Sequence, residues 1–103
     1  MEFSKNNKHI VEYCQSNKGK HIKCEQTGTI YSIWQIEDIP KKNREFSVQE
    51  FLPQYVGIAS LGIKYLVAVN LYNGKVISVP FIPMDIDSSI ELADNIDNLT
   101  IID

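Results

Sequence analysis

Two cysteines and two histidines are the side chains of this 103-residue chain that could most readily serve in catalysis or bind a metal. Cys14 or Cys24 could act as a nucleophile beside the imidazole of His9 or His21, and the four together could be imagined as a zinc set. No recognisable nucleophile–base motif surrounds them, and neither cysteine has a partner at the short spacing typical of zinc ligands. We therefore expect no metal, no cofactor and two free thiols that are buried or half-buried.

Two other short segments resemble ligand-binding loops, but each lacks residues that such a loop requires. Asn73-Gly74-Lys75 lacks the glycine-rich spacing of a phosphate-binding loop. Asp85–Ser89 begins like a calcium loop, but Ile90 stands where that loop requires glycine and Ile96 where it requires the bidentate glutamate. The two aspartates of this segment could do acid–base chemistry, although such a pair before a helix is far more often a cap and turn. We predict that the protein is not an enzyme.

Charge is distributed unevenly along the chain. The net charge is −3, yet residues 1–44 carry eight basic against five acidic residues, and residues 45–103 carry two against eight. Six of the acids lie from Asp85 to Asp103, with no basic residue among them. Nucleic-acid binding favours a basic stripe interleaved with aromatic residues, so we expect no nucleic-acid partner.

The acidic end of the chain has two interpretations. In the simpler one, the charges form the solvated face of a helix and stabilise its N-terminus. In the other, they form a surface that attracts a cationic protein partner. The candidate partner-binding residues are the acids Asp85, Asp87, Glu91, Asp94 and Asp97, together with Tyr72 beside the Asn-Gly turn. For Tyr72 the alternative is a tyrosine that covers the end of a hairpin.

Length and hydropathy place the chain among soluble proteins. The chain has the length of one domain, which we assign to residues 1–103. No apolar run approaches the roughly 20 residues of a membrane helix. The polar segment Met1–Lys8 lacks the apolar region of a signal peptide. We predict a cytoplasmic protein with no membrane partner.

Hydrophobic periodicity predicts an α+β fold, with a mostly antiparallel sheet of about five strands between a short N-terminal helix and a C-terminal helix. The N-terminal helix is expected from about Lys5 to Ser16. The expected strands are His21–Gln26, Ile30–Ile36, Tyr55–Ser60, Tyr65–Leu71 and Val76–Val79, the first two forming a hairpin. The nearly all-apolar run Tyr65–Leu71 is expected to be a central strand covered on both faces.

The middle of the chain contains a charged connector and one short helical turn. Pro40 is expected to limit the connector, residues 37–43, to a single helical turn at its start. Ser47 and Glu50 form a capping-box pattern that predicts the helical turn after it. Trp34 is expected in the core, with an exposed interface anchor as the alternative.

The last third of the chain is predicted to form a hairpin, a turn that contains two prolines, and a capped helix. Asn73-Gly74 predicts a type I′ turn, and Pro80 should end the strand that follows. Part of Phe81–Met84 is expected to plug one end of the core. Ser88 and Glu91 form a second capping box, which predicts a helix from about Ser88 to Asn98 with Leu92, Ala93, Ile96 and Leu99 on its buried face.

The order of these segments resembles the SUKH superfamily, the Smi/Knr-like domains. The similarity covers about Ile30 to Leu99. It runs through Trp34, Glu37-Asp38, Phe51-Leu52-Pro53, Ile58-Ala59-Ser60, Asn73-Gly74-Lys75-Val76, the Pro80–Asp85 turn and the Ile90–Leu99 segment. The chain departs from the family pattern in the apolar, lysine-bearing loop Ser60–Lys64 and in its short N-terminal region.

The resemblance implies a protein that acts by binding. Bacterial members of the family resemble immunity proteins for secreted toxins, many of them nucleases, and others resemble regulators of cell-wall synthesis. An immunity protein would neutralise its cognate toxin by covering the toxin's active face. On that hypothesis the acidic residues would imitate phosphates toward a basic nuclease cleft. The alternative is an intracellular regulatory or scaffold domain with no toxin partner.

Overall fold

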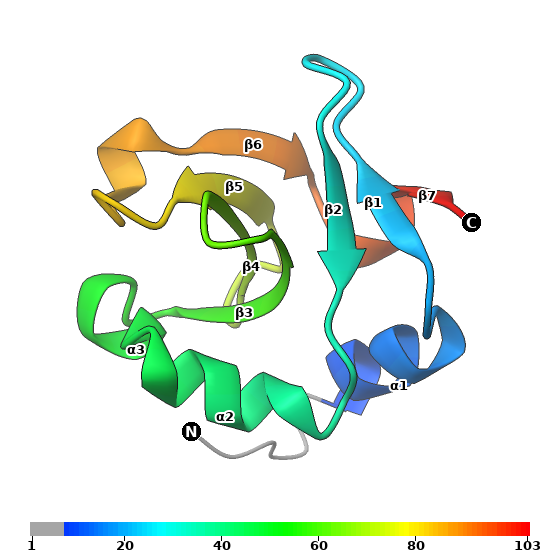
Figure 1. Ribbon diagram of the computed structural model, residues 1–103, viewed down its shortest axis with the longest axis horizontal. Coiled ribbons are helices and arrows are strands. Elements are labelled where there is room, and N and C mark those ends of the chain that lie inside the picture. Colours follow the sequence, from blue (N-terminus) through cyan, green and yellow to red (C-terminus); the bar gives the residue numbers. More distant parts are fainter. Residues whose placement is uncertain (1–7) are drawn as a thin grey trace.

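The computed structural model describes residues 8–103 (Figure 1). Seven antiparallel strands form one sheet in the order β6-β5-β4-β3-β2-β1-β7. The strands are β1 (His21–Lys23), β2 (Ile30–Ile33), β3 (Tyr55–Leu61), β4 (Tyr65–Asn70), β5 (Val76–Pro80), β6 (Ile90–Ala93) and β7 (Thr100–Ile102). The helices are α1 (Lys8–Ser16), α2 (Asp38–Glu45) and α3 (Val48–Phe51), with the 3-10 turns η2 (Ile86–Ser88) and η3 (Ile96–Asn98).

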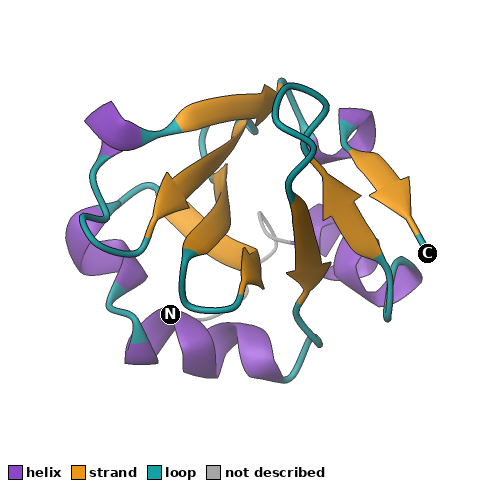
Figure 2. Cartoon of the chain, turned by 45° about the horizontal axis from the view of Figure 1, so that its top comes forward, coloured by secondary structure: helices purple, strands orange, loops and turns teal. Residues whose placement is uncertain are grey.

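The sheet curls into half of a barrel. Its edge strand β6 approaches the turn of the β1–β2 hairpin, while α1 and α2 lie along the opposite side of the molecule (Figures 1 and 2). The predicted hairpin is confirmed, with Ile22 opposite Tyr31. The predicted central strand is also confirmed, because β4 lies between β3 and β5 and is buried from Leu66 to Asn70. The part of the chain that the structure describes contains no helix long and apolar enough to cross a membrane.

The chain is α+β, but the predicted sheet of about five strands and the predicted C-terminal helix are both wrong. Residues Ile90–Ala93 form β6 and pair with β5, and Thr100–Ile102 form β7 and pair with β1. A helix of this length is marginal unless it packs, and pairing with the edge of an existing sheet supplies the backbone hydrogen bonds instead. Of the expected helix face only Ile96 is buried below a tenth of its surface, at 3 % exposed.

In place of the predicted capping box, this segment contains two short turns, the first capped by the side chain of Asp85 and the second by that of Asn95. The Asp87 N–H donates to Oδ1 of Asp85 at 3.0 Å and starts η2. The Asp97 N–H donates to Oδ1 of Asn95 at 2.9 Å and starts η3. These side chains satisfy local backbone donors without a longer helix, so the segment turns twice and places β6 between the turns.

The helices also differ in detail from their predictions. The described part of the N-terminal helix begins at Lys8, so its predicted start at Lys5 lies outside the described residues. Pro40 sits in the first turn of α2, where its missing N–H would have no helical partner, and the helix therefore continues to Glu45. Ser47 precedes α3 in the left-handed region, at φ 54°, and makes no side-chain cap, so the capping box predicted there is wrong.

The β4–β5 hairpin forms around Asn73-Gly74, but not through the predicted two-residue turn. The loop spans residues 71–75, and the Gly74 N–H donates to the Asn70 carbonyl at 2.9 Å. Gly74 has a positive φ of 79°, whereas Asn73 does not have the positive φ that a type I′ turn requires. The side chain of Asn70 explains the longer loop, because its Oδ1 accepts from the N–H groups of Tyr72 and Asn73.

Candidate functional site

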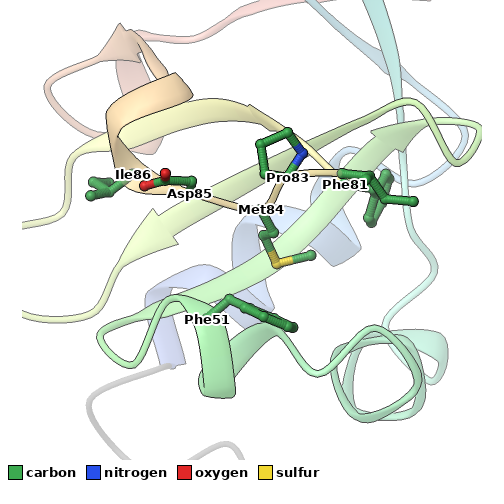
Figure 3. A pocket seen from close by; sticks show the side chains of 7 residues that line it. Phe51, Phe81, Pro83, Met84, Asp85 and Ile86 are labelled. Atoms are coloured by element: carbon green, nitrogen blue, oxygen red, sulfur yellow. The ribbon is translucent and has the colours of Figure 1, made fainter.

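An apolar hollow opens where α3 faces the loop between β5 and η2. It has a volume of about 510 Å³ and is lined by Phe51, Phe81, Ile82, Pro83, Met84, Asp85 and Ile86, the set that we call the apolar hollow. Figure 3 shows Phe51 projecting from α3 toward Met84 and Pro83 on the opposite wall. Two segments far apart in the sequence therefore build one concave apolar surface.

The rim of the hollow exposes large apolar side chains to solvent. Ile82 is 92 % exposed, Phe51 57 % and Ile86 46 %. Single exposed apolar residues are ordinary, but several around one depression are typical of interaction sites and ligand-binding grooves. The arrangement can therefore receive an apolar side chain from another molecule.

The floor of the hollow is anchored in the core. Met84 is buried at 8 % exposed, and the ring of Phe81 lies 4.6 Å from that of Phe46. Phe46 in turn stacks on Trp34 at 6.4 Å. The expectation that part of this loop plugs the core is confirmed for Met84, and the core position of Trp34 is confirmed at 4 % exposed. The rings keep the loop in place, so the exposed Ile82 is presented on a fixed support.

One of the predicted acidic residues lines this hollow, and a second follows it two residues later in the chain. Asp85 lines it, and Asp87 follows in η2, exposed to solvent. Within residues 8–103, neither carboxylate forms an ion pair with a lysine, arginine or histidine. The apolar hollow thus has uncompensated negative charge on one side.

The other three predicted acids lie in β6 or after it in the chain. Glu91 is in β6 and forms an ion pair at 3.5 Å with Lys75, the residue before β5, which partly neutralises the charge of Glu91. Oδ2 of Asp97, in η3, lies 3.0 Å from Nε2 of His9, within hydrogen-bonding distance. Asp94 follows β6, with its carbonyl close to Gly74. Of the five predicted acids, Glu91 and Asp97 therefore each have a basic partner, whereas Asp85 and Asp87 have none among the described residues.

Tyr72 lies in the loop between β4 and β5. It is 83 % exposed and lines a hollow of about 250 Å³ beside Asn95 and Ile96. The position confirms the expectation that Tyr72 lies near a surface at the hairpin end. The structure brings it close to η3 rather than to Asp85.

The two thiols are free and buried, Cys14 in α1 and Cys24 directly after β1. Burial raises the pKa of Cys14, in α1, to about 12, so this thiol is protonated at neutral pH. Burial also acts to raise the pKa of Cys24, but hydrogen bonds from the Thr27 side chain and from the N–H groups of Thr27 and Gln26 outweigh it and lower the pKa. Among the described residues no group of three or more His, Cys, Asp or Glu side chains is placed to hold a metal ion.

The sequence does not predict that Phe51 forms a wall of the apolar hollow. The apolar residues Phe46, Val48, Phe51 and Leu52 all fit one side of the helical turn that the sequence predicts, but Phe51 is 57 % exposed. Val48 and Phe51 are spaced at i and i+3, which lie on one face of a helix, so their spacing alone predicts that both are buried. Ile82 and Ile86 belong to segments that sequence alone assigned to a plug and a cap.

A scan against models of known protein families gave no match for this chain, and a search of curated proteins found no similar sequence. The resemblance to Smi/Knr-like domains therefore rests on the order and spacing of the segments alone. It remains a hypothesis.

Proposed function

We propose that this protein is a non-enzymatic binding protein that neutralises a cognate protein toxin by occluding the toxin's active face. The observation that carries the proposal is the apolar hollow with its exposed rim at Phe51, Ile82 and Ile86 and its acidic side at Asp85. Such a surface suits a protein partner better than a small substrate, because its exposed apolar groups gain most from being covered.

The binding surface combines two physical contributions. Burial of Ile82 and Phe51 against the partner would supply the central apolar contact, the part of an interface that usually dominates affinity. Asp85 and Asp87 would attract a basic region of the partner and speed the encounter. A partner that combines an apolar side chain with neighbouring lysines or arginines therefore fits this end of the molecule.

A nuclease toxin is the partner class we propose, with the protein acting in the cytoplasm as an immunity protein of the SUKH type. Nuclease clefts are basic because they bind phosphates, which matches the sign of Asp85 and Asp87. Glu91, Asp94, Asp97 and Tyr72 do not line the apolar hollow, and we assign them to the periphery of the interface. The acids that would imitate phosphates are therefore limited to Asp85 and Asp87, the two nearest to the apolar hollow in the chain.

A second candidate function is a regulatory or scaffold domain without a toxin partner. The observation in its favour is the separate hollow beside the 83 % exposed Tyr72. Two exposed surfaces at opposite ends of β5 would suit a domain that joins two proteins. A toxin gene next to the gene for this chain favours immunity, and a neighbourhood without one favours the scaffold.

Co-expression tests the proposal directly. The toxin domain encoded beside this gene is expressed with the unchanged protein, with Ile82→Asp or with Ile30→Asp. Ile30 is a matched control, because it is an exposed isoleucine, at 43 %, on β2. We expect growth with the unchanged protein and with the control, and loss of growth with Ile82→Asp. Equal protection by all three folded proteins would contradict the proposed surface.

A further inference from the structure

A second concave site lies at the open side of the half-barrel. It has a volume of about 410 Å³, within the range of small-molecule sites, and lies between the β1–β2 turn and the strands β5 and β6. Its lining residues are Thr27, Thr29, Tyr31, Tyr65, Ser78, Pro80, Ser88 and Ile90, the set that we call the hydroxyl crevice. Six of these eight residues carry a hydroxyl group and none carries a charge, so this crevice differs in kind from the apolar hollow.

The hydroxyls of the crevice are held in place by the fold. Tyr31 and Ser78 are 2 % and 4 % exposed, and their hydroxyl oxygens lie 2.7 Å apart, joining β2 to β5 across the inside of the curved sheet. At the outer edge the Thr27 and Thr29 hydroxyls also lie 2.7 Å apart. Buried hydroxyls with fixed partners are preorganised, which lowers the entropic cost of binding a ligand.

These hydroxyls keep unused hydrogen-bonding capacity. A hydroxyl has one donor and two acceptor positions, and the bond within each pair uses the donor of only one member. Tyr31 with Ser78 can therefore offer a further donor and several acceptors. Thr27 already accepts from the Thr29 N–H at 3.3 Å and hydrogen-bonds to Cys24, so at the outer edge it is Thr29 that offers acceptor positions. A ligand matched to the crevice must itself present both donors and acceptors.

The absence of charge from the lining selects against ionic ligands. An anion or cation taken into the crevice would lose hydration without meeting an opposite charge. The ring of Tyr65 and the side chains of Pro80 and Ile90 supply apolar contact on the same surface. A ligand with hydroxyls around an apolar ring face satisfies all of these conditions.

We propose that the hydroxyl crevice binds a neutral, polyhydroxylated ligand of the carbohydrate class. The sugar hydroxyls would exchange hydrogen bonds with Thr29 and Ser88 at the accessible edge and with the Tyr31–Ser78 pair at the base. The apolar face of the ring would lie against Tyr65 and Ile90. This site is independent of the protein-binding surface at the apolar hollow.

The test is a titration of the full chain followed by two-dimensional NMR of its amide resonances. The probes are N-acetyl-D-glucosamine and methyl α-D-glucopyranoside, with D-glucuronate as the charged comparison. We expect both neutral sugars to shift the resonances of Thr29, Tyr31, Ser78 and Ile90 in a saturable way, and glucuronate to bind more weakly.

Two variants separate a binding role from a structural one. Thr29→Val and Ser88→Ala each remove one hydroxyl from the accessible edge, and each should raise Kd by about fivefold, as expected for the loss of one neutral hydrogen bond. Thr100→Val, on the edge strand β7 and outside the lining of the crevice, should leave Kd unchanged. Absence of saturable shifts with both neutral sugars would overturn the proposal, as would equal binding of glucuronate or equal Kd values in Thr29→Val and Thr100→Val.

Discussion

The side-chain amide of Asn43 pairs with both backbone polar groups of Gly57. The Gly57 N–H donates to Oδ1 of Asn43 at 2.8 Å, and Nδ2 of Asn43 donates to the Gly57 carbonyl at 2.9 Å. Gly57 lies where the register between β3 and β4 shifts, so an irregular point of the strand is completed by a side chain of α2. This contact fixes α2 on the sheet, and α2 leads directly into α3, which carries Phe51 of the apolar hollow.

Replacing Asn43 should therefore destabilise the whole fold. Asn43 is fully buried, at 0 % exposed, and Asn43→Leu leaves two buried backbone groups of Gly57 without partners. We expect a loss of about 2–4 kcal/mol in the free energy of unfolding, measured by chemical denaturation. Asn98→Leu is the control on an exposed asparagine and should change it by less than about 0.5 kcal/mol. A similar stability for the two variants would show that the Asn43–Gly57 pair contributes little.

Gly57 is required for packing as well as for the pair. An added Cβ would lie 2.8 Å from Cδ1 of Leu66 and 3.3 Å from Cζ3 of Trp34. Both neighbours are buried, so they cannot move away freely, and Gly57→Ala should cost about 1–3 kcal/mol of stability. Leu66→Val makes room, so the double variant should lose less than the sum of the two single variants. Strict additivity in thermal or chemical unfolding would exclude the steric explanation.

The contact between Tyr31 and Ser78 should be measurable as a coupling. Tyr31→Phe removes a hydroxyl whose partner is buried, and we expect a loss of about 1–2 kcal/mol. Ser78→Ala should cost a similar amount, and the double variant should cost less than the sum because each single change leaves the other hydroxyl unpaired. Additive losses in a double-mutant cycle would mean that the 2.7 Å contact does not stabilise the fold.

Stability should fall at alkaline pH. Burial raises the pKa of Cys14 from its ordinary value of 9.0 to about 12, and burial together with nearby Cys14 and Asp97 raises that of Tyr13 from 10.0 to about 12. Both groups are protonated in the folded protein at a pH where the unfolded chain has released the protons, so stability is complete below about pH 9 and decreases toward pH 12. In Cys14→Ala the decrease should begin nearer pH 10. An unchanged onset in that variant would exclude Cys14 as a cause.

Much of the sheet could be predicted because its signals are local. The alternation in residues 21–36 predicts the β1–β2 hairpin, and the apolar run from Tyr65 predicts the central strand β4. The strands β6 and β7 could not be recognised in this way. Their residues also fit one face of a helix, and the choice is made by pairing with β5 and with the distant β1, which no short window of sequence contains.

The site was predictable only in part for the same reason. Asp85 and Asp87 were identified from charge, and the loop from Phe81 to Met84 from its composition. The apolar hollow needs Phe51 opposite that loop, an arrangement that depends on how Asn43 seats α2 on β3. A buried asparagine within a charged segment gives no sign of this role in the sequence. Long-range contacts therefore decide which predicted acids share a surface.

The exposed apolar rim should dominate partner binding. Ile82→Asp places a charge at the centre of the proposed interface, and we expect a loss of affinity for the toxin domain of about thirtyfold or more, corresponding to about 2 kcal/mol. Asp85→Asn should act differently, slowing association and reducing its dependence on salt while changing the dissociation rate little. An Asp85→Asn effect confined to dissociation would contradict electrostatic steering by this residue.

Calorimetric titration of the proposed partner, the toxin domain encoded beside this gene, with the full chain tests the central claim most directly. We predict saturable binding by the unchanged protein and by Ile30→Asp, and binding weakened by about thirtyfold or more in Ile82→Asp, with all three proteins showing the same unfolding transition. Equal affinities for Ile82→Asp and Ile30→Asp, or no binding by the unchanged protein, would contradict the assignment of the apolar hollow as the surface that covers the toxin.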